Sequence, residues 1–212
     1  MQDKKLIITI DGGSASGKGA ISRIISKKYN AVYLDTGKLY RALAKLIKES
    51  KLEDYYENQL EELCNEITEK LLADKTLQDD DISYFSSIIS ANLLVRKSLY
   101  KYQRDLIKSS QKIVLDGRDV GSVICPEANF KFYIEANLEV RAKRRYMQNT
   151  AYYKKNNITI SDLEKTLAER DKRDMERKNS PLIIPKGAHI IDNSRDNIEV
   201  IIKKMSDIID YS

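Results

Sequence analysis

Cysteine and histidine are scarce in this sequence. Its 212 residues include two cysteines, Cys64 and Cys125, and a single histidine, His189. The cysteines are far apart, do not form a Cys-x-x-Cys pair, and have only that histidine as a possible companion ligand. We therefore expect neither a disulfide bond nor a zinc site.

The chain also lacks tryptophan and long apolar segments. No run approaches the roughly 20 apolar residues that a transmembrane helix needs. Residues 1–5 lead into Leu6–Ile10, an apolar run that is too short for a secretory signal and has no small-residue cleavage site. We expect no membrane association and a cytoplasmic location. Because no repeat or linker is visible, the length favours a single domain over 1–212.

Positive charge is modest overall but unevenly distributed. The net charge is +5, and basic residues concentrate between 141 and 178. This concentration indicates an anionic ligand, although a solvated helix face with paired charges would give the same pattern. A nucleic-acid partner is not expected, because the isoelectric point is too low and the tyrosines are scattered. The basic residues of this region are Arg141, Lys143, Arg144, Arg145, Arg170, Lys172, Arg173, Arg177 and Lys178.

The pattern of apolar residues predicts an α/β fold. Short β-branched runs at 6–10, 31–34, 113–115, 130–134 and 189–191 are typical of buried strands. A helix is expected from about Lys18, with Ile21, Ile24 and Ile25 on one face, and another after Asp35-Thr36-Gly37. Residues 55–73 and 82–110 are expected to be mostly helical, separated by an acidic turn at 79–81. Alternating strands and helices favour a mainly parallel, five-stranded sheet with helices on both faces.

A glycine-rich loop follows the first predicted strand. Residues 12–18 fit the pattern GxxxxGK between a strand and a helix, the context that gives this motif its meaning. Such a loop turns backbone N–H groups toward a phosphate, the helix N-terminus adds positive dipole, and Lys18 reaches the β and γ oxygens. A nucleotide-phosphate site is therefore predicted, with a merely structural glycine turn as the alternative.

The loop lacks a hydroxyl where one is usual. Ser or Thr normally follows the lysine and holds Mg²⁺, whereas here Gly19 and Ala20 follow. Candidates for metal ligation are Ser16, water, and Asp116, which ends the predicted strand 113–115. Asp116 could instead be a turn residue before Gly117.

Arginines recur beside short polar residues at predicted strand ends and helix starts. Ligands bind at the strand ends of open α/β sheets, so several arginines there indicate a dianionic ligand held by bidentate contacts. A surface salt bridge could explain any one of them. The residues are Thr36 with Arg41, Arg96, Arg118 with Asp119, and Arg170 with Asp174 and Arg177.

Six segments together resemble the bacterial cytidylate kinase family and cover most of the chain in order. The pair DGRDxG and ERDxRDxxR is far more specific than the glycine loop. The segments are ITIDGGSASGKG, LDTGKLYRALA, SSIISANLLVRKSLYKYQR, LDGRDVGSVICPEA, ERDKRDMERKNSPL and AHIIDNS. The resemblance implies a P-loop kinase fold and transfer of the γ-phosphate of ATP to CMP or dCMP, with Mg²⁺ as cofactor, in pyrimidine nucleotide metabolism. A monomer is expected.

The resemblance also implies roles for particular residues. Lys18, Arg118 and Arg177 would be catalytic, and Arg41, Arg118 and Arg177 would grip the acceptor phosphate. Ser87, Arg96 and Asp119 would address the cytosine, Thr36 would line the same pocket, and Arg170 and Asp174 would lie near the sugar. Arg141, Arg144 and Arg145 would border a lid over the ATP phosphates. The ATP-binding residues would be Gly12, Gly13, Ser14, Ala15, Ser16, Gly17, Lys18, Gly19, Ala20, Arg144 and Arg145.

These roles agree with the chemistry of the bases. A carboxylate can accept from the N4 amine of cytosine, and arginine or serine can donate to O2 and N3. Asp119 would therefore disfavour uracil, whose O4 cannot donate.

The resemblance divides the chain into three parts. The core would comprise 1–37, 112–140 and 180–212, with an acceptor-binding region at 38–111 and a lid at 145–178. Two departures from the family pattern are Ala20 and a shortened insert at about Asn65 to Gln78, which we expect to be partly helical.

The sequence leaves two other hypotheses for the function open. A kinase for another nucleotide, or for a hydroxyl acceptor such as shikimate, would keep the glycine loop but use a different acceptor site. A module that binds ATP without turnover would also keep the loop, and the missing hydroxyl is the feature that favours it.

Overall fold

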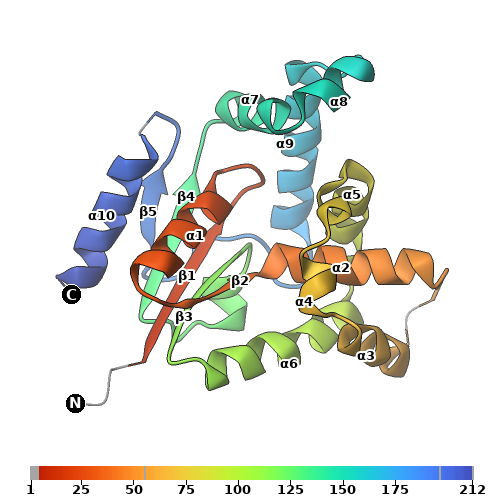
Figure 1. Ribbon diagram of the computed structural model, residues 1–212, viewed down its shortest axis with the longest axis horizontal. Helices are drawn as coiled ribbons and strands as arrows, with labels where there is room; N and C mark the ends of the chain where they lie inside the picture. Colours follow the sequence, from red (N-terminus) through yellow and green to blue (C-terminus); the bar gives the residue numbers. More distant parts are fainter. Residues whose placement is uncertain (1–4, 55, 196, 212) are drawn as a thin grey trace.

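The computed structural model describes residues 5–54, 56–195 and 197–211. Five strands form one sheet in the order β2-β3-β1-β4-β5, and each pair of neighbours is parallel (Figure 1). The strands are β1 Leu6–Gly12, β2 Val32–Asp35, β3 Lys112–Gly117, β4 Phe130–Glu135 and β5 His189–Asp192. The sheet and its strand positions confirm the α/β fold predicted from the sequence, and the described sheet is entirely parallel.

Alternation along the central strands places a separate core on each face of the sheet. Ile113 and Leu115 of β3 pack with helices α2 (Thr36–Glu49) and α6 (Leu93–Ser109). Val114, between them, packs on the other face with α1 (Lys18–Lys28) and α10 (Ile198–Asp210). Because side chains alternate with a period of two, a strand buried on both faces reads as an unbroken apolar run.

Several helices follow one another in the chain between β2 and β3, beginning with α2. The chain runs through α3 (Glu57–Asn65), α4 (Glu69–Leu72), a short 3₁₀ helix at Lys75–Gln78 and α5 (Asp80–Ile89) before it reaches α6. The insert at about Asn65 to Gln78 contains α4 and the 3₁₀ helix, so it is partly helical, as expected from the sequence.

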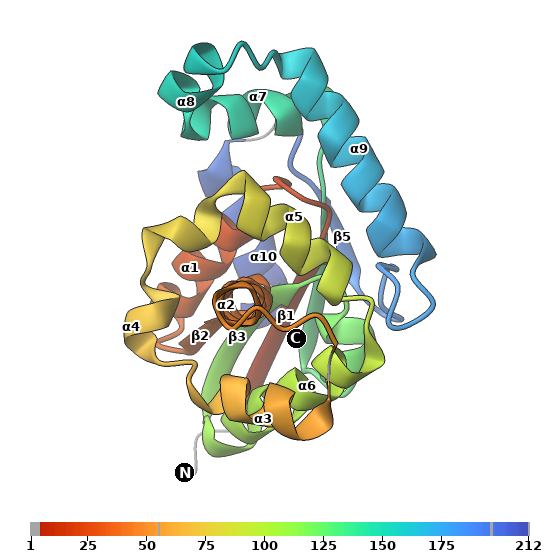
Figure 2. The ribbon, with the colours of Figure 1, turned by 90° about the vertical axis from the view of Figure 1, so that its right-hand side faces the viewer.

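A helical arm rises above the sheet. It consists of α7 (Leu138–Gln148), α8 (Thr150–Lys155) and α9 (Ile160–Glu176), and in Figure 2 it arches over the glycine loop. A small core of Ala142, Tyr153, Leu163 and Leu167 holds the arm together.

Two local expectations were wrong. The acidic segment 79–81 is not a turn: Asp80 and Asp81 form the first turn of α5, where their charge favours the helix N-terminus. Ile24 is exposed on α1, whereas Ile21 and Ile25 are buried, because only one stripe of the helix faces the sheet. Residues 1–4, residue 55 at the start of the predicted segment 55–73, and residue 212 lie outside the described part.

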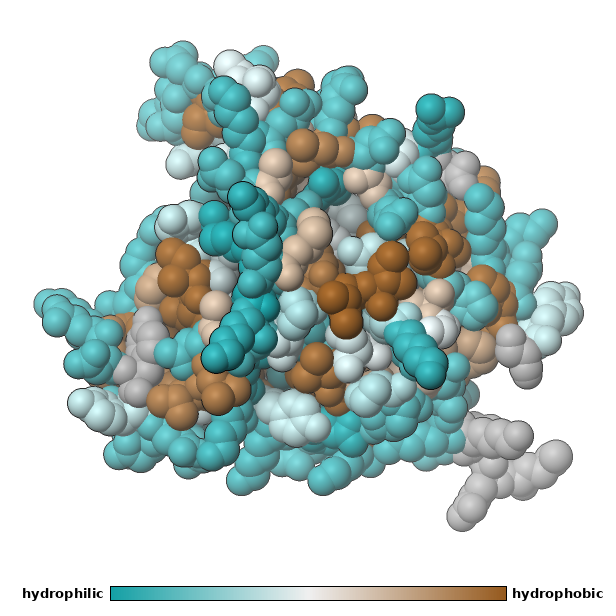
Figure 3. Space-filling view, turned by 180° about the vertical axis from the view of Figure 1, so that it is seen from behind, coloured by the Kyte–Doolittle hydropathy of each residue, from teal (hydrophilic) through white to brown (hydrophobic). Residues whose placement is uncertain are grey.

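Polar side chains dominate the surface seen from behind, with hydrophobic residues gathered near its centre (Figure 3). Within the described residues, no helix is both long and apolar enough to cross a membrane. Cys64 and Cys125 are buried as free thiols.

Candidate active site

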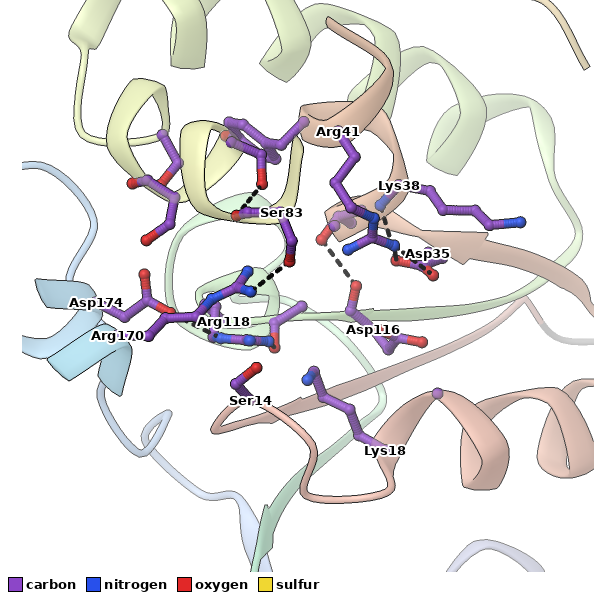
Figure 4. Close-up of a pocket in the computed structure, with 18 of the residues that line it drawn as sticks. Ser14, Lys18, Asp35, Lys38, Arg41, Ser83, Asp116, Arg118, Arg170 and Asp174 are labelled. Carbon is purple, nitrogen blue, oxygen red and sulfur yellow. Dashed lines mark hydrogen bonds and ion pairs between the residues drawn. The ribbon is translucent and has the colours of Figure 1, made fainter. Parts of the chain in front are cut away.

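A cavity of about 450 Å³ opens at the carboxyl ends of β1, β2 and β3. Figure 4 shows Lys18 reaching from the glycine loop toward the space between Arg118 and Asp116. The walls come from the glycine loop, α1, α2, α5, α6, the loop after β3, α7 and α9. Sequence-predicted residues among the lining are Ser14, Ala15, Lys18, Gly19, Thr36, Arg41, Ser87, Arg96, Asp116, Arg118, Asp119, Arg145, Arg170, Asp174 and Arg177.

The glycine loop connects β1 directly to α1. Gly17 adopts φ +91°, a left-handed conformation that disfavours other residues, and it caps the N-terminus of α1. The Lys18 ammonium donates to the carbonyl of Gly13 at 3.1 Å. Burial, followed by the nearby positive charge of Arg118, lowers the pKa of Lys18 to about 7. A negatively charged group in the cavity would restore the charge of this lysine.

Asp11, the residue before the loop, was not singled out from the sequence. It is buried, and its carboxylate accepts from the N–H groups of Val120 at 2.8 Å and Gly121 at 2.7 Å. Burial raises the pKa of Asp11 to about 7. These two bonds hold the segment that carries Arg118 and Asp119 against β1.

Asp119 lies between two buried arginines. Arg96 of α6 donates to one carboxylate oxygen, and Arg177, at the end of α9, donates to the other at 3.3 Å. Burial raises the pKa of Asp119 and lowers that of Arg177. The Ser87 hydroxyl, on the same cavity wall, is buried without a hydrogen-bond partner. The cluster therefore offers a carboxylate, guanidinium donors and a free hydroxyl within one wall.

Three further arginines face the cavity, each held by a short polar side chain. Arg118 donates to Asp174 at 3.0 Å, and Arg41 pairs with Asp35 at 3.3 Å. Arg170 donates to Ser83 at 2.7 Å.

Positive charge accumulates where Arg41, Arg118 and Arg170 face the cavity. Burial, and then the neighbouring guanidinium of Arg118, lowers the pKa of Arg170 to about 9. Such mutual repulsion favours an anion that contacts several guanidinium groups at once.

The three arginines of α7 go to different places. Arg141 pairs with Asp171 of α9 and donates to the carbonyl of Ser14 at 3.2 Å. Arg145 enters the main cavity and pairs with Asp80 at the start of α5.

Arg144 lines a second hollow, of about 570 Å³, on the outer side of the glycine loop. Its guanidinium donates to the carbonyl of Asn193 at 2.7 Å. Asn193 donates in turn to the carbonyl of Ser16 at 2.8 Å. The sequence patterns had not singled out Asn193 as a site residue. Ala15, Ser16, Gly17, Lys18, Gly19 and Ala20 border this hollow, whereas Gly13 faces a third one beside Arg141 and Asp171.

Asp116 and Asp35 pair with each other near the carboxyl ends of the neighbouring strands β3 and β2. Burial, and then the charge of Asp35, raises the pKa of Asp116 to about 6. Tyr33 donates to Asp116 Oδ2 at 2.5 Å, and Thr36 donates to the Asp116 carbonyl at 2.8 Å. A divalent cation would relieve this repulsion, and Mg²⁺ commonly uses one or two carboxylates together with substrate phosphates. These oxygens therefore fit Mg²⁺. Ser16, the other candidate metal ligand, lines the two hollows outside the loop and not the cavity that contains Asp116.

No group of three or more His, Cys, Asp or Glu side chains is close enough to hold a metal within 5–54, 56–195 and 197–211. A metal at Asp116 would therefore depend on phosphates and water for its remaining ligands.

Comparison with known proteins agrees with the family resemblance of the sequence segments. Residues 8–211 match the cytidylate kinase family. The cytidylate kinase of Bartonella bacilliformis is 39% identical over 96% of this chain and 94% of its own length. That of Rhizobium meliloti is 37% identical over 96% and 95%, respectively.

Solved structures share the fold at low identity. TT1252 from Thermus thermophilus has a TM-score of 0.53 at 15% identity, covering 99% of both chains. Shikimate kinase from Acinetobacter baumannii has a TM-score of 0.50 at 11% identity, covering 98% of this chain and 94% of its own. These likenesses show a P-loop kinase fold, and the closer relatives place the chain more narrowly: it belongs to the cytidylate kinase family.

Proposed function

We propose that this chain transfers the γ-phosphate of ATP to CMP or dCMP, which gives CDP or dCDP and ADP. One observation carries the proposal. A single cavity joins the lysine of a phosphate-binding loop to a wall of arginines and to a buried carboxylate that can read a base. The curated relatives are named cytidylate kinases.

The charges of the cavity favour a phosphate acceptor over a hydroxyl acceptor. A hydroxyl must lose a proton, so its kinase needs a carboxylate that is free to act as a base. Here Asp119 and Asp174 pair with arginines, and Asp35 with Arg41. Asp116 accepts from the Tyr33 hydroxyl and is the carboxylate that we assign to Mg²⁺, so it is not available as a base either. A nucleoside monophosphate is already largely dianionic at neutral pH, because its second pKa is about 6. It needs no base, and the arginines suit its charge.

Cytosine fits the polar groups around Asp119. Its N4 amine can donate to the carboxylate, while O2 and N3 can accept from Arg96 or from the unpartnered Ser87 hydroxyl. Uracil presents O4 where cytosine has the amine, which sets two acceptors against each other. We infer that Asp119 selects CMP and dCMP over UMP.

Phosphoryl transfer in this site would rest on position and charge. The glycine loop and Lys18 would hold the donor phosphates, while Arg41, Arg118 and Arg177 would hold the acceptor phosphate in line with them. Charge spreads over the transferred group in the transition state, so fixed cations lower the barrier without covalent chemistry. Mg²⁺, held by Asp116 with Asp35 nearby, would neutralise charge on the donor phosphates.

We also infer a division of the chain. Residues 1–37, 112–140 and 180–212 form the core, residues 38–111 bind the acceptor, and residues 145–178 form the lid. Support comes from α2, α5 and α6, which line the cavity at Arg41, Ser87 and Arg96. On the other side, Arg145 extends into the cavity from the helical arm.

Transfer of labelled phosphate tests the proposal. With [γ-³²P]ATP, Mg²⁺ and CMP, the label should appear in CDP, and Lys18→Ala should remove most of the transfer. An ATP-binding module without turnover would bind ATP but leave CMP unlabelled. In a parallel reaction with shikimate in place of CMP, a shikimate kinase would label shikimate.

A further inference from the structure

The glycine loop has no side chain at the position where P-loops usually carry Ser or Thr. Gly19 follows Lys18 and lies in the first turn of α1. A Cβ added to Gly19 would lie 3.7 Å from Asp116 Oδ2 and 3.8 Å from the Tyr33 hydroxyl. A side chain at position 19 would thus enter the space beside the Tyr33 hydroxyl.

Tyr33 reaches Asp116 from the adjacent strand. In the β2–β3 register, Tyr33 pairs with Val114 and Asp35 with Asp116, so Tyr33 and Asp116 are diagonal neighbours on one face. The hydroxyl donates to Asp116 Oδ2 at 2.5 Å. The guanidinium carbon of Arg23 lies over the Tyr33 ring, 5.9 Å from the ring centroid. Arg23 borders both the main cavity and the second hollow.

The Ala20 side chain does not occupy the space beside Asp116 and the Tyr33 hydroxyl. Its side chain is exposed and borders the hollow on the outer side of the loop, away from the cavity that Asp116 lines. Successive helical residues differ by about 100° in direction, which explains why positions 19 and 20 face different spaces.

We propose that Tyr33 supplies, from β2, the hydroxyl that this glycine loop lacks, and that it positions the Asp116 carboxylate for the Mg²⁺ that accompanies the nucleotide. Tyr33 is a positioning residue, since it acts through Asp116. A hydrogen bond to one carboxylate oxygen fixes the orientation of the other, and outer partners of this kind are typically worth 10- to 100-fold in metal affinity. The inference rests on the proposed function only in taking Mg²⁺ with ATP or ADP as the ligand.

Calorimetric titration of the full chain with ADP, with and without Mg²⁺, measures this effect without turnover. In Tyr33→Phe, the Mg²⁺-dependent gain in ADP affinity should fall about 10-fold, while affinity for metal-free ADP changes less than about twofold. Tyr29→Phe is the matched control, because its hydroxyl donates to Asp210 at 2.8 Å on the surface. It should behave as wild type.

A second substitution tests whether the two hydroxyls are equivalent. Gly19→Ser should restore most of the Mg²⁺-dependent gain in the Tyr33→Phe background, because the added Cβ meets only ordinary contacts. Ala20→Ser places the same hydroxyl one residue further on and should not restore it. With Tyr33 present, Gly19→Ser should change the gain less than about twofold.

Three results would overturn the inference. They are a Tyr33→Phe protein with an unchanged Mg²⁺-dependent gain, a wild-type ADP affinity that is independent of Mg²⁺, and a tenfold larger gain in Gly19→Ser alone. The last needs no change at Tyr33, so it holds even if Tyr33→Phe fails to fold. None of these titrations contains CMP, so a failure of CMP phosphorylation would reject the proposed function separately.

Discussion

Replacing Asp119 with asparagine should reduce the use of CMP while sparing ATP binding. The carboxylate is buried, with 5% of the residue exposed, and it meets Arg96 and Arg177. Asparagine keeps the shape and one oxygen acceptor but introduces an amide that donates. The variant thus alters the group proposed to read the cytosine amine and keeps the volume of the site.

The expected fall in kcat/KM for CMP follows from the kind of hydrogen bond that is lost. A hydrogen bond to a charged group is worth about 1.5–3 kcal/mol, which corresponds to a fall of roughly 10- to 150-fold in kcat/KM for CMP. UMP should lose less, because the new amide can donate to O4 of uracil. Asparagine and alanine both remove the negative charge that faces Arg96 and Arg177. Removing one partner of a buried ion pair costs about 3–5 kcal/mol, or about 6–20 °C in Tm for a chain of this size, so the Tm of the variant is measured first. Asp119→Ala is a poorer choice, since it also removes the acceptor oxygen and the volume that asparagine keeps.

Coupled measurement of ADP release gives kcat/KM for CMP and UMP in each protein. Glu127→Gln serves as the control, because it removes a carboxylate that pairs with Arg104 at 2.6 Å outside the cavity. It should leave the CMP to UMP ratio unchanged. If folded Asp119→Asn keeps the wild-type ratio, Asp119 does not read the base.

Substitutions at Lys18, Asp116, Ala20 and Asp80 also have defined outcomes. Lys18→Met should lower kcat at least about 100-fold with Tm unchanged or raised, because a charge lost from the transition state is also a buried charge removed. Because burial lowers the pKa of free Lys18 to about 7, binding of anionic ADP at pH 8 should be accompanied by proton uptake. Calorimetry in two buffers of different ionisation enthalpy measures this uptake, and Lys18→Met should abolish it. Asp116→Asn should raise the Mg²⁺ concentration needed for half-maximal turnover, whereas Ala20→Thr, on the outer side of the loop, should not. Asp80→Asn should free Arg145 and lower the KM for ATP a few-fold; an unchanged KM would show that the Asp80 pair does not compete with phosphate.

Local sequence patterns predicted the elements of the fold. The apolar run at the start of β1 ends in a glycine loop, and the following residues have helical spacing. Each of these signals depends on neighbours within about ten residues, so they could be read without a structure. Asp80 and Ile24 were misassigned because a helix start and a solvent-facing helix position depend on packing, which the sequence shows only indirectly.

The partners within the site could not be predicted in the same way. Arg96, Asp119 and Arg177 come from α6, the loop after β3 and the end of α9, and only the tertiary fold brings them together. Asp11 looked like the end of an apolar strand, although it holds the loop that carries Arg118. Tyr33 gave a weak signal, since alternation along β2 places it on the same face as Asp35, but the register with β3 was needed to find Asp116.

A comparison of acceptors tests base selection most directly. ADP release is measured with ATP, Mg²⁺ and each of CMP, dCMP, UMP, AMP and GMP in turn. The site described above predicts that kcat/KM for CMP or dCMP exceeds that for each of the other three at least tenfold, or by about 1.4 kcal/mol. Faster turnover of UMP, AMP or GMP, or no transfer to any of the five, would contradict it.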